Sequence, residues 1–359
     1  MTDVLRLSAE QSYAAELAAL SAADDGPRPV GWKLTPKAVL TYLMGGAAPG
    51  GTAITPKYVG QRRLIETAVA TLATDRALLL MGVPGTAKSW VSEHLAAAIA
   101  GDSTLLIQCT AGTDETQIRY GWNYAELLAH GPSEAALVAT PLMRAMREGA
   151  LCRLEEFTRL GSDVQDTLIT VLSEKVLPIP ELATALPARR GFNVIATANS
   201  RDKGVNELSS ALKRRFNVVV LPLPATLEEE VSIVRRRVRE LADDLALPVP
   251  RGVDEQIKAV LTVFRELRSG VTADNKVTLK TPSGTLSTAE AIGTLVGGLS
   301  QAAWFADGQL GARELAAPMV GAIVKDPVQD KAVLAEYLET VLKRRRGYAQ
   351  YYAELGEAL

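Results

Sequence analysis

The segment Gly82–Ser89 reads Gly-Val-Pro-Gly-Thr-Ala-Lys-Ser and carries the residue types needed to bind a phosphate chain. It follows the apolar run Ala77–Met81 and precedes the helix-like stretch Trp90–Ala100. In that order, backbone N–H groups of the loop and the positive end of the helix can surround phosphates. Lys88 would reach the β- and γ-phosphates of a nucleotide, and Ser89 would ligate Mg²⁺. The segment therefore predicts a phosphate-binding P-loop, in preference to a chance glycine-rich turn.

Within this loop, Ala87 stands where the strict pattern has glycine. A methyl group is tolerated there only where the backbone φ angle is negative, because side chains disfavour the left-handed region. We therefore expect a negative φ at Ala87. The loop residues that we expect to contact the nucleotide are Gly82, Val83, Pro84, Gly85, Thr86, Ala87, Lys88 and Ser89.

Two carboxylates and an amide follow later apolar runs. Glu155 and Glu156 follow the run Ala150–Leu154, and Asn199 follows the run Phe192–Ala198. The carboxyl ends of parallel strands meet at the sheet edge where a P-loop holds phosphates. We expect Glu155 to act in the outer coordination sphere of Mg²⁺, Glu156 to polarise the attacking water and Asn199 to position that water. The alternatives are a carboxylate pair that only starts a helix and an asparagine that only makes a turn.

These groups need a parallel sheet to bring them together, and the apolar runs predict one. Five short runs are largely apolar without clean alternation, which is typical of strands buried on both faces. The sequence therefore predicts a five-stranded parallel sheet covered by helices. One of these helices has a capping-box pattern at Ser162-x-x-Gln165. The expected strands are Ala77–Met81, Thr104–Cys109, Ala150–Leu154, Phe192–Ala198 and Val218–Leu221, and the expected helices are Gln61–Thr74, Trp90–Ala100 and Asp163–Glu174.

Beyond Pro222 and Pro224 the pattern becomes helical, so we expect a domain boundary there. We divide the chain into an N-terminal helical segment (residues 1–50), an α/β nucleotide-binding core (51–224) and an α-helical C-terminal region (225–359). Helix starts outside the core are predicted by cap patterns at Ser8-x-x-Gln11, Thr35-Pro36, Thr226-x-x-Glu229 and Ser287-x-x-Glu290.

The composition indicates a globular protein of the cytoplasm. The chain has 359 residues, of which 47% are hydrophobic, and its net charge of −2 argues against nucleic-acid and anionic-membrane surfaces. No apolar run approaches the roughly twenty residues needed for membrane insertion. Cys109 and Cys152 lie in apolar runs and are expected to be reduced core residues. We expect His94 on a helix surface and His130 in a loop, without a transition metal.

Several motifs occur together in an order known from one family. The chain resembles the MoxR-type AAA+ ATPases over about Tyr58 to Leu221. The resemblance implies an AAA+ core with an α-helical lid, ATP and Mg²⁺ as ligands, Walker B roles for Glu155 and Glu156, and a sensor 1 role for Asn199. The motifs are Tyr58-Val-Gly-Gln61, the P-loop, Leu154-Glu-Glu-Phe157 followed by Arg159, Ala196-Thr-Ala-Asn199 and Leu212-Lys-Arg-Arg-Phe216.

The resemblance also assigns a basic residue that acts on a neighbouring subunit. Arg215 is the implied arginine finger, and Arg214 is the second candidate. From the residues alone, residues 213–215 could equally be a solvated basic helix end. Further contacts to the nucleotide are implied at Val59, Gly60 and Trp90.

Two departures from the family pattern favour slow turnover. Glu155 stands where Walker B normally begins with Asp, and its extra methylene would shift the Mg²⁺ shell. The stretch Ser287–Glu290, where a sensor-2 arginine is expected, contains no arginine, although Arg313 could substitute.

Two segments are longer than plain connections. Thr110–Arg144 and Val176–Arg190 fall where the resemblance implies hairpin inserts, the first of them facing a central pore. The aromatic residues of the first segment are interpreted as a small core under a long loop, with a pore contact as the alternative. These residues are Tyr120, Trp122 and Tyr124.

The resemblance implies a homo-oligomeric ring, a hexamer, in which Arg215 completes the site of the next subunit. The ring would hydrolyse ATP with Mg²⁺ and remodel or mature a partner protein, and the resemblance implies a partner with a von Willebrand factor A domain. The alternatives are an ATP-gated scaffold with little turnover and a nucleic-acid-linked motor resembling McrB. The near-neutral charge disfavours the second alternative.

Overall fold

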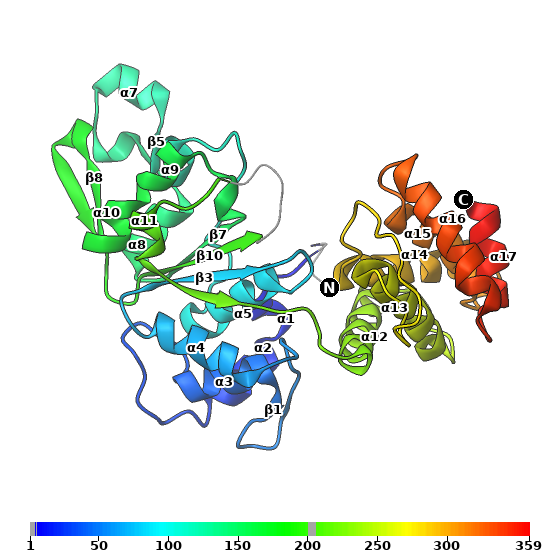
Figure 1. The fold of residues 1–359 in the computed structure, drawn as a ribbon. Coiled ribbons are helices and arrows are strands. Elements are labelled where there is room, and N and C mark those ends of the chain that lie inside the picture. The colour runs from blue at the N-terminus through cyan, green and yellow to red at the C-terminus, as the bar shows by residue number, and fades with distance from the viewer. Residues whose placement is uncertain (1–3, 5, 200–205) are drawn as a thin grey trace. The chain divides into compact units, whose positions relative to one another are not determined.

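The computed structural model describes residue 4 and residues 6–199 and 206–359. They form two compact units, of which the first runs to Pro222, apart from Pro84–Thr86, and the second begins at Leu223 (Figure 1). The first unit contains a parallel sheet, and the named elements of the second are all helices. Among the described helices of both units, none is long and apolar enough to span a bilayer.

The first unit is built on a five-stranded parallel sheet with strand order β11-β3-β10-β7-β4. All five predicted strands are therefore confirmed as members of one sheet. Gly82, the last residue of β3, is in register with Asn199 at the end of β10, and Glu155 ends β7. The sheet consists of β3 (Ala77–Gly82), β4 (Leu106–Gln108), β7 (Leu151–Glu155), β10 (Asn193–Asn199) and β11 (Phe216–Val220).

Both faces are buried along the central strands β3, β7 and β10, which explains why these strands are largely apolar. Leu78 and Leu80 pack with helices α2–α5 in one core, whereas Leu79 packs with α8, α10 and α11 in another. The helices of this unit are α1 (Ala9–Ser12), α2 (Ala14–Ser21), α3 (Pro36–Met44), α4 (Arg62–Leu72), α5 (Lys88–Ala100), α6 (Glu115–Ile118), α7 (Tyr124–His130), α8 (Pro141–Glu148), α9 (Ser162–Asp166), α10 (Leu168–Glu174) and α11 (Ser210–Lys213), with 3-10 turns η1 (Glu134–Ala136), η2 (Phe157–Arg159) and η3 (Pro180–Leu182).

The capping box predicted at Ser162 is wrong. Gly161 is the N-cap of α9, and Ser162 already lies inside the helix. Gln165 is buried, and its side-chain amide donates to the backbone oxygen of Leu160 at 3.0 Å instead of reaching back to Ser162. The helix therefore starts one residue earlier than predicted, because the side chain of Gln165 satisfies the preceding loop.

In the described part of the chain, three two-stranded antiparallel sheets accompany the large sheet, and two of them lie in the long segments singled out in the sequence. In the first segment Tyr120 is buried and stacks edge-on with Trp122 at 6.0 Å, whereas 71% of Tyr124 is exposed. Tyr120 is therefore buried in the same core as the sheet rather than in a separate small core, and Tyr124 lies exposed on α7. The two-stranded sheets are β1 (Gly46–Ala47) with β2 (Ala53–Ile54), β5 (Tyr120–Trp122) with β6 (Leu137–Ala139), and β8 (Val176–Ile179) with β9 (Thr184–Pro187).

A single hydrophobic core joins the helices of the second unit. The capping boxes predicted at Thr226 and Ser287 form, and their hydroxyls accept from the third helical N–H at 3.1 and 3.3 Å. A Cβ added to Gly298 would lie 2.6 Å from Leu315 Cδ2, so the close approach of α14 and α15 needs glycine there. The helices are α12 (Leu227–Asp244), α13 (Val253–Ser269), α14 (Thr288–Phe305), α15 (Ala312–Ile323), α16 (Gln329–Thr340) and α17 (Ala349–Ala358), with the 3-10 turn η4 (Leu342–Arg344).

The cysteines lie where we expected them, but the two histidines do not. Cys109 and Cys152 are buried free thiols, as predicted, and burial raises the pKa of Cys109 to about 12. His94 is fully buried, so its predicted place on a helix surface is wrong. Helix α5 is enclosed on nearly all sides, which no amphipathic pattern in its sequence reveals. His130 is exposed at the end of α7 rather than in a loop.

Candidate functional site

The P-loop lies between the end of β3 and the start of α5, as predicted. Lys88 is the first residue of α5, and only 8% of it is exposed. Its ammonium donates to the backbone oxygens of Gly82 at 3.1 Å and Val83 at 3.0 Å. The charge is thus held against the loop itself, at the positive end of a helix, where an anion is stabilised.

Ala87 does not have the negative φ that we expected. Its φ is +63° and its ψ is 23°, which is the left-handed conformation. The chain reverses direction between β3 and α5, and left-handed residues at Gly85 and Ala87 make that turn. The left-handed region costs a residue with a side chain roughly 1–2 kcal/mol, and such strain is often found at functional sites.

We expect Ala87→Gly to raise the free energy of unfolding by about 0.5–1 kcal/mol. The substitution removes the left-handed strain, and only part of this gain is offset by the greater freedom of glycine in the unfolded chain. Urea unfolding followed by circular dichroism measures the change. Ala70 lies exposed inside α4, so Ala70→Gly should instead lower stability by about 1 kcal/mol. Equal effects at the two positions would contradict the strain at Ala87.

The carboxylate of Glu155 faces the P-loop helix. Only 3% of Glu155 is exposed, and its Oε2 accepts from Ser89 Oγ at 2.6 Å and from Thr197 Oγ1 at 2.6 Å. Its Oε1 accepts from the Ser92 hydroxyl. The structure thus brings together the P-loop serine and the strand-end carboxylate that the sequence pointed to. Thr197 and Ser92 were not predicted as site residues.

Arg153 is the main site residue that the sequence analysis missed. It lies on β7 two positions before Glu155, on the same face of the strand, and is buried. Its Nη2 is 2.9 Å from Glu155 Oε1 and also donates to the backbone oxygen of Ser89 at 3.2 Å. Its Nε donates to Ser92 Oγ at 3.0 Å, and its Nη1 donates to Ser103 O at 2.9 Å. The sequence did offer a signal: Arg153 is a charged residue inside an apolar run, and it stands two positions before Glu155, the spacing that puts both side chains on one face of a strand.

The groups around Glu155 lower the pKa of its carboxyl group. Burial by itself raises the pKa of the carboxyl group, but the charge of Arg153 and the donated hydroxyl hydrogen bonds outweigh burial. The pKa of Glu155 is therefore lowered, and the group is an anion at neutral pH. Its contribution to stability is lost as the pH falls through the lowered pKa.

We expect Arg153→Met to lower the free energy of unfolding by about 3–5 kcal/mol, because it leaves a buried carboxylate without its cation. Adding Glu155→Gln to that variant should recover part of the loss. Arg144→Met is the control, since the Arg144–Glu148 pair is exposed and should change stability by less than about 1 kcal/mol. Thermal and urea unfolding measure all three proteins. Equal losses from Arg153→Met and Arg144→Met would show that the buried pair does not stabilise the fold.

Glu156 and Asn199 lie at the same edge of the sheet. The N–H of Glu156 donates to Thr197 Oγ1 at 3.1 Å, and the residue has a left-handed φ of +59°. Its carboxylate pairs with Arg159. Asn199 is in register with Gly82 at the start of the P-loop. Thr197 therefore connects the two consecutive glutamates, through the side chain of one and the backbone of the other.

The other predicted residues lie outside this cluster. Arg215 follows α11, and its guanidinium contacts Ser173 Oγ and, at 2.6 Å, the backbone oxygen of Ala211, so its contacts are not with the cluster. Arg214 is exposed. Trp90 packs edge-on against His94 on the same helix, with ring centroids 4.3 Å apart.

The predicted contacts Val59 and Gly60 lie in the loop before α4. Val59 is half-buried and Gly60 is exposed. A Cβ added to Gly60 would lie 2.8 Å from the hydroxyl of Tyr58, so this position excludes a side chain. The preceding residues of the loop are fixed, because the backbone N–H groups of Lys57 and Tyr58 both donate to Leu43 O, at 2.8 and 2.9 Å.

The donor atoms of the cluster fit Mg²⁺. Ser89 and Glu155 present hydroxyl and carboxylate oxygens, the hard ligands that Mg²⁺ takes together with water and substrate phosphates. Among the described residues there is no group of three or more His, Cys, Asp or Glu that could hold a metal alone.

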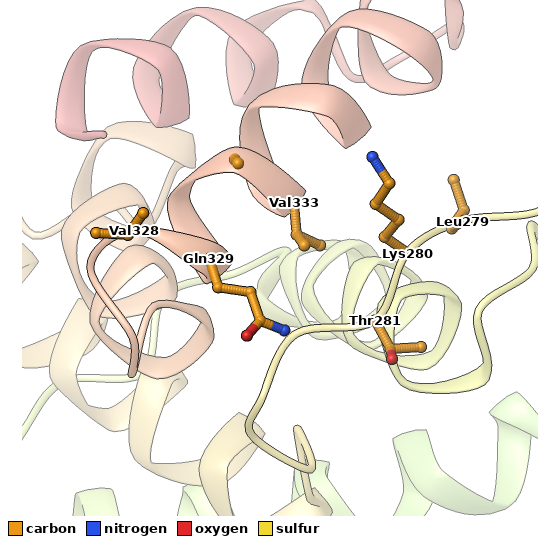
Figure 2. A pocket seen from close by; sticks show the side chains of 7 residues that line it. Leu279, Lys280, Thr281, Val328, Gln329 and Val333 are labelled. Atoms are coloured by element: carbon orange, nitrogen blue, oxygen red, sulfur yellow. The ribbon is translucent and has the colours of Figure 1, made fainter.

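A pocket of about 600 Å³ lies in the second unit (Figure 2). Its walls come from the segment after α13 and from the first turns of α16. Lys280 pairs with Glu336 at 2.7 Å, so the lysine of the lining is already engaged. We assign this pocket no role. The lining residues are Leu279, Lys280, Thr281, Val328, Gln329, Ala332 and Val333.

Comparison with known families agrees with this arrangement. Residues 77–216 match the AAA domain of the dynein-related subfamily, and residues 228–355 match the C-terminal domain of YehL-like AAA+ ATPases. The chain belongs to the MoxR-type AAA+ ATPases. The predicted family and fold class, an AAA+ core with a parallel sheet followed by an α-helical lid, are thereby confirmed.

Two curated relatives of this MoxR-type ATPase match part of the chain. The uncharacterized protein YehL of Escherichia coli is 51% identical over 198 residues, which cover 54% of each chain. Protein NorQ of Paracoccus denitrificans is 30% identical over 152 residues, which cover 42% of this chain and 53% of NorQ. The chain thus spans about half the length of these curated relatives. The crystal structure of NtrX from Brucella abortus with ADP has a TM-score of 0.49 at 14% identity, covering 77% of this chain and 58% of NtrX.

Proposed function

We propose that this protein is a Mg²⁺-dependent ATPase that assembles into a ring, a hexamer by family resemblance, and uses hydrolysis to remodel or mature a partner protein. The observation that carries the proposal is the convergence of Lys88, Ser89 and Glu155 at the end of the sheet where β3 delivers the P-loop. Lys88 is positioned by its bonds to the loop, and Ser89 is joined to Glu155 at 2.6 Å.

Each residue of the cluster has a role in this proposal. The backbone of the P-loop and Lys88 would bind the phosphate chain. Ser89 would ligate Mg²⁺, Glu155 would act in its outer coordination sphere, and the ion would neutralise charge on the β- and γ-phosphates. Glu156 would accept a proton from the attacking water, and Asn199 would orient that water. Arg215 of a neighbouring subunit would stabilise the charge that develops on the γ-phosphate.

The partner and the place of action are also proposals. Because similar proteins commonly act with von Willebrand factor A-domain proteins, we propose a client or adaptor of that class. We propose that the protein works in the cytoplasm, where its substrate ATP is available and buried free thiols such as Cys109 and Cys152 remain reduced.

An ATP-gated scaffold with little turnover is the second candidate. It is favoured by the fact that both strand-end glutamates are paired with arginines, Glu155 with Arg153 and Glu156 with Arg159. If saturating partner leaves turnover unchanged while a non-hydrolysable ATP analogue gives the full biological effect, the scaffold is correct and the motor is not. The nucleic-acid-linked alternative requires DNA or RNA binding with a steep salt dependence.

Calorimetric titration with ATP tests the site itself. We expect Lys88→Ala to weaken ATP affinity by roughly ten- to a hundredfold, because a hydrogen bond to a charged group contributes about 1.5–3 kcal/mol. Lys37 is an exposed lysine of α3, and Lys37→Ala should leave the affinity unchanged. Equal affinities of wild type and Lys88→Ala would overturn the assignment of the P-loop as the nucleotide site.

A further inference from the structure

The N-terminal residues before α4 are attached along the length of the P-loop helix α5. Arg6 Nη2 pairs with Glu93 Oε2 at 2.7 Å. The backbone N–H of Lys33 donates to Ile99 O at 2.7 Å. Beyond the end of the helix, the N–H of Ser103 donates to Glu10 Oε2 at 3.2 Å. The helix that begins with Lys88 is therefore held along its length by a segment that the proposed chemistry does not use.

A buried lysine lies at the centre of this N-terminal packing. Only 3% of Lys57 is exposed, and its Nζ pairs with Glu16 Oε2 at 2.6 Å and donates to Thr55 O at 2.7 Å. The same ammonium lies 4.0 Å from the ring centroid of Tyr13 and 4.5 Å from that of Tyr42. Glu16 also accepts from the backbone N–H of Thr55 at 3.2 Å. Glu16 of α2 thus fixes both the backbone and the charge of the loop that leads to Val59.

The same rings reach the P-loop helix. Tyr42 Oη and His94 Nδ1 are 2.8 Å apart, and the rings of Tyr13 and His94 stack edge-on at 5.1 Å. On the same helix, Trp90 also packs edge-on against His94. One continuous cluster therefore joins α2, the Lys57 loop and the first turns of α5.

We propose that Tyr13, Glu16 and Lys57 are positioning residues that hold the Val59–Gly60 loop at a fixed place relative to the P-loop helix, so that the pocket for the adenine base is formed before ATP binds. This inference rests on the proposed function, because the resemblance gives Val59 and Gly60 as nucleotide contacts, and they meet the base only if the P-loop binds the phosphates. The P-loop holds the phosphates, and the cluster fixes the second part of the site. The reason is preorganisation: a loop that is already in place loses no further conformational entropy on binding.

The proposal predicts an effect on binding of the base but not on binding of the phosphates, so the experiment compares a ligand that has a base with one that has none. Affinities of the full chain for ATP and for inorganic tripolyphosphate, both with Mg²⁺, are measured by displacement of a fluorescent N-methylanthraniloyl-ATP. In the double variant Glu16→Gln/Lys57→Met, which removes the buried ammonium and its partly buried carboxylate partner, we expect ATP affinity to fall about tenfold and tripolyphosphate affinity to change by less than twofold. The double variant avoids the unpaired buried charge that either single change would leave.

A graded pair of variants distinguishes positioning from general support of the fold. Tyr13→Phe keeps the ring beside Lys57 and should retain wild-type ATP affinity, whereas Tyr13→Leu should lower it about threefold. Arg144→Ala, an exposed change on α8, is the control and should alter neither affinity. Circular dichroism confirms that each variant is folded.

The outcomes are distinct. A fall of the ATP affinity alone supports the proposal. Equal falls for ATP and tripolyphosphate, or loss of folding, would overturn it, because the cluster would then stabilise the whole fold. Unchanged ATP affinity in the double variant would also overturn it, because the cluster would then have no effect on binding of the base. If wild-type protein fails to bind both the fluorescent nucleotide and ATP, the proposed function itself is wrong, which is a different result.

Discussion

Glu156→Gln should bind ATP as tightly as the wild type and hydrolyse it roughly 10²–10⁴-fold more slowly. The carboxylate of Glu156 lies at the end of the P-loop sheet, and its backbone is fixed by Thr197 at 3.1 Å. An amide of the same size keeps this place but accepts no proton, and a positioned general base contributes about that factor. Single-turnover hydrolysis of radiolabelled ATP measures the rate, and calorimetry measures the affinity.

Two further glutamate variants serve as the control and as the test of the assigned roles. Glu174→Gln changes an exposed glutamate at the end of α10 and should leave the rate unaltered. Glu155→Gln should change the dependence on Mg²⁺ concentration more than the rate at saturating Mg²⁺. If Glu155→Gln gave the larger loss of rate with unchanged Mg²⁺ dependence, the roles of the two glutamates would have to be exchanged.

The sheet and the meeting of its strand ends could be predicted because both depend on local patterns. Strands buried on both faces read as continuous apolar runs, and residues at the carboxyl ends of parallel strands must meet. Ser89 and Glu155, 66 positions apart in sequence, are therefore found together as expected. The same reasoning explains why Asn199 was found beside Gly82.

What could not be predicted depends on tertiary contacts or on backbone torsion. The positive φ of Ala87 follows from the geometry of the turn into α5, which residue identity alone does not reveal. The pairing of Arg153 with Glu155 needs both the strand alternation and the hydroxyl of Ser92 on another element. His94 is buried because the N-terminal residues cover α5, a contact between segments that no periodicity encodes.

Arg153 also gives a physical reason for the unusual Glu155. An aspartate side chain is one methylene shorter, so it would lie farther from both the guanidinium and the P-loop serine. With glutamate, one carboxylate oxygen reaches Arg153 at 2.9 Å and the other reaches Ser89 at 2.6 Å. The longer acid and the buried arginine are therefore complementary, and the glutamate reaches both Arg153 and Ser89.

The second large effect is expected at Arg215. Arg215→Ala should bind ATP normally and lose roughly 10³-fold or more in turnover, as removal of an arginine finger does. Bonds to Ser173 and to Ala211 O hold its guanidinium at the end of α11. A planar, permanently charged group held in this way suits the charge on a transferring phosphoryl group. Arg214→Ala is the matched control, because its side chain is exposed at the adjacent position; a larger loss there would make Arg214 the finger.

Mixing subunits decides whether Arg215 acts on its neighbour. In a ring assembled from Arg215→Ala and Lys88→Ala subunits, some sites combine an intact P-loop from the first with an intact arginine from the second. Such sites should hydrolyse ATP, so a mixture of two inactive proteins should recover part of the wild-type rate, and the recovery should depend on their ratio. Subunit exchange is followed by fluorescence energy transfer between labelled chains. No recovery after complete exchange would mean that Arg215 acts within its own subunit, where its bonds to Ser173 and Ala211 already give it a structural role.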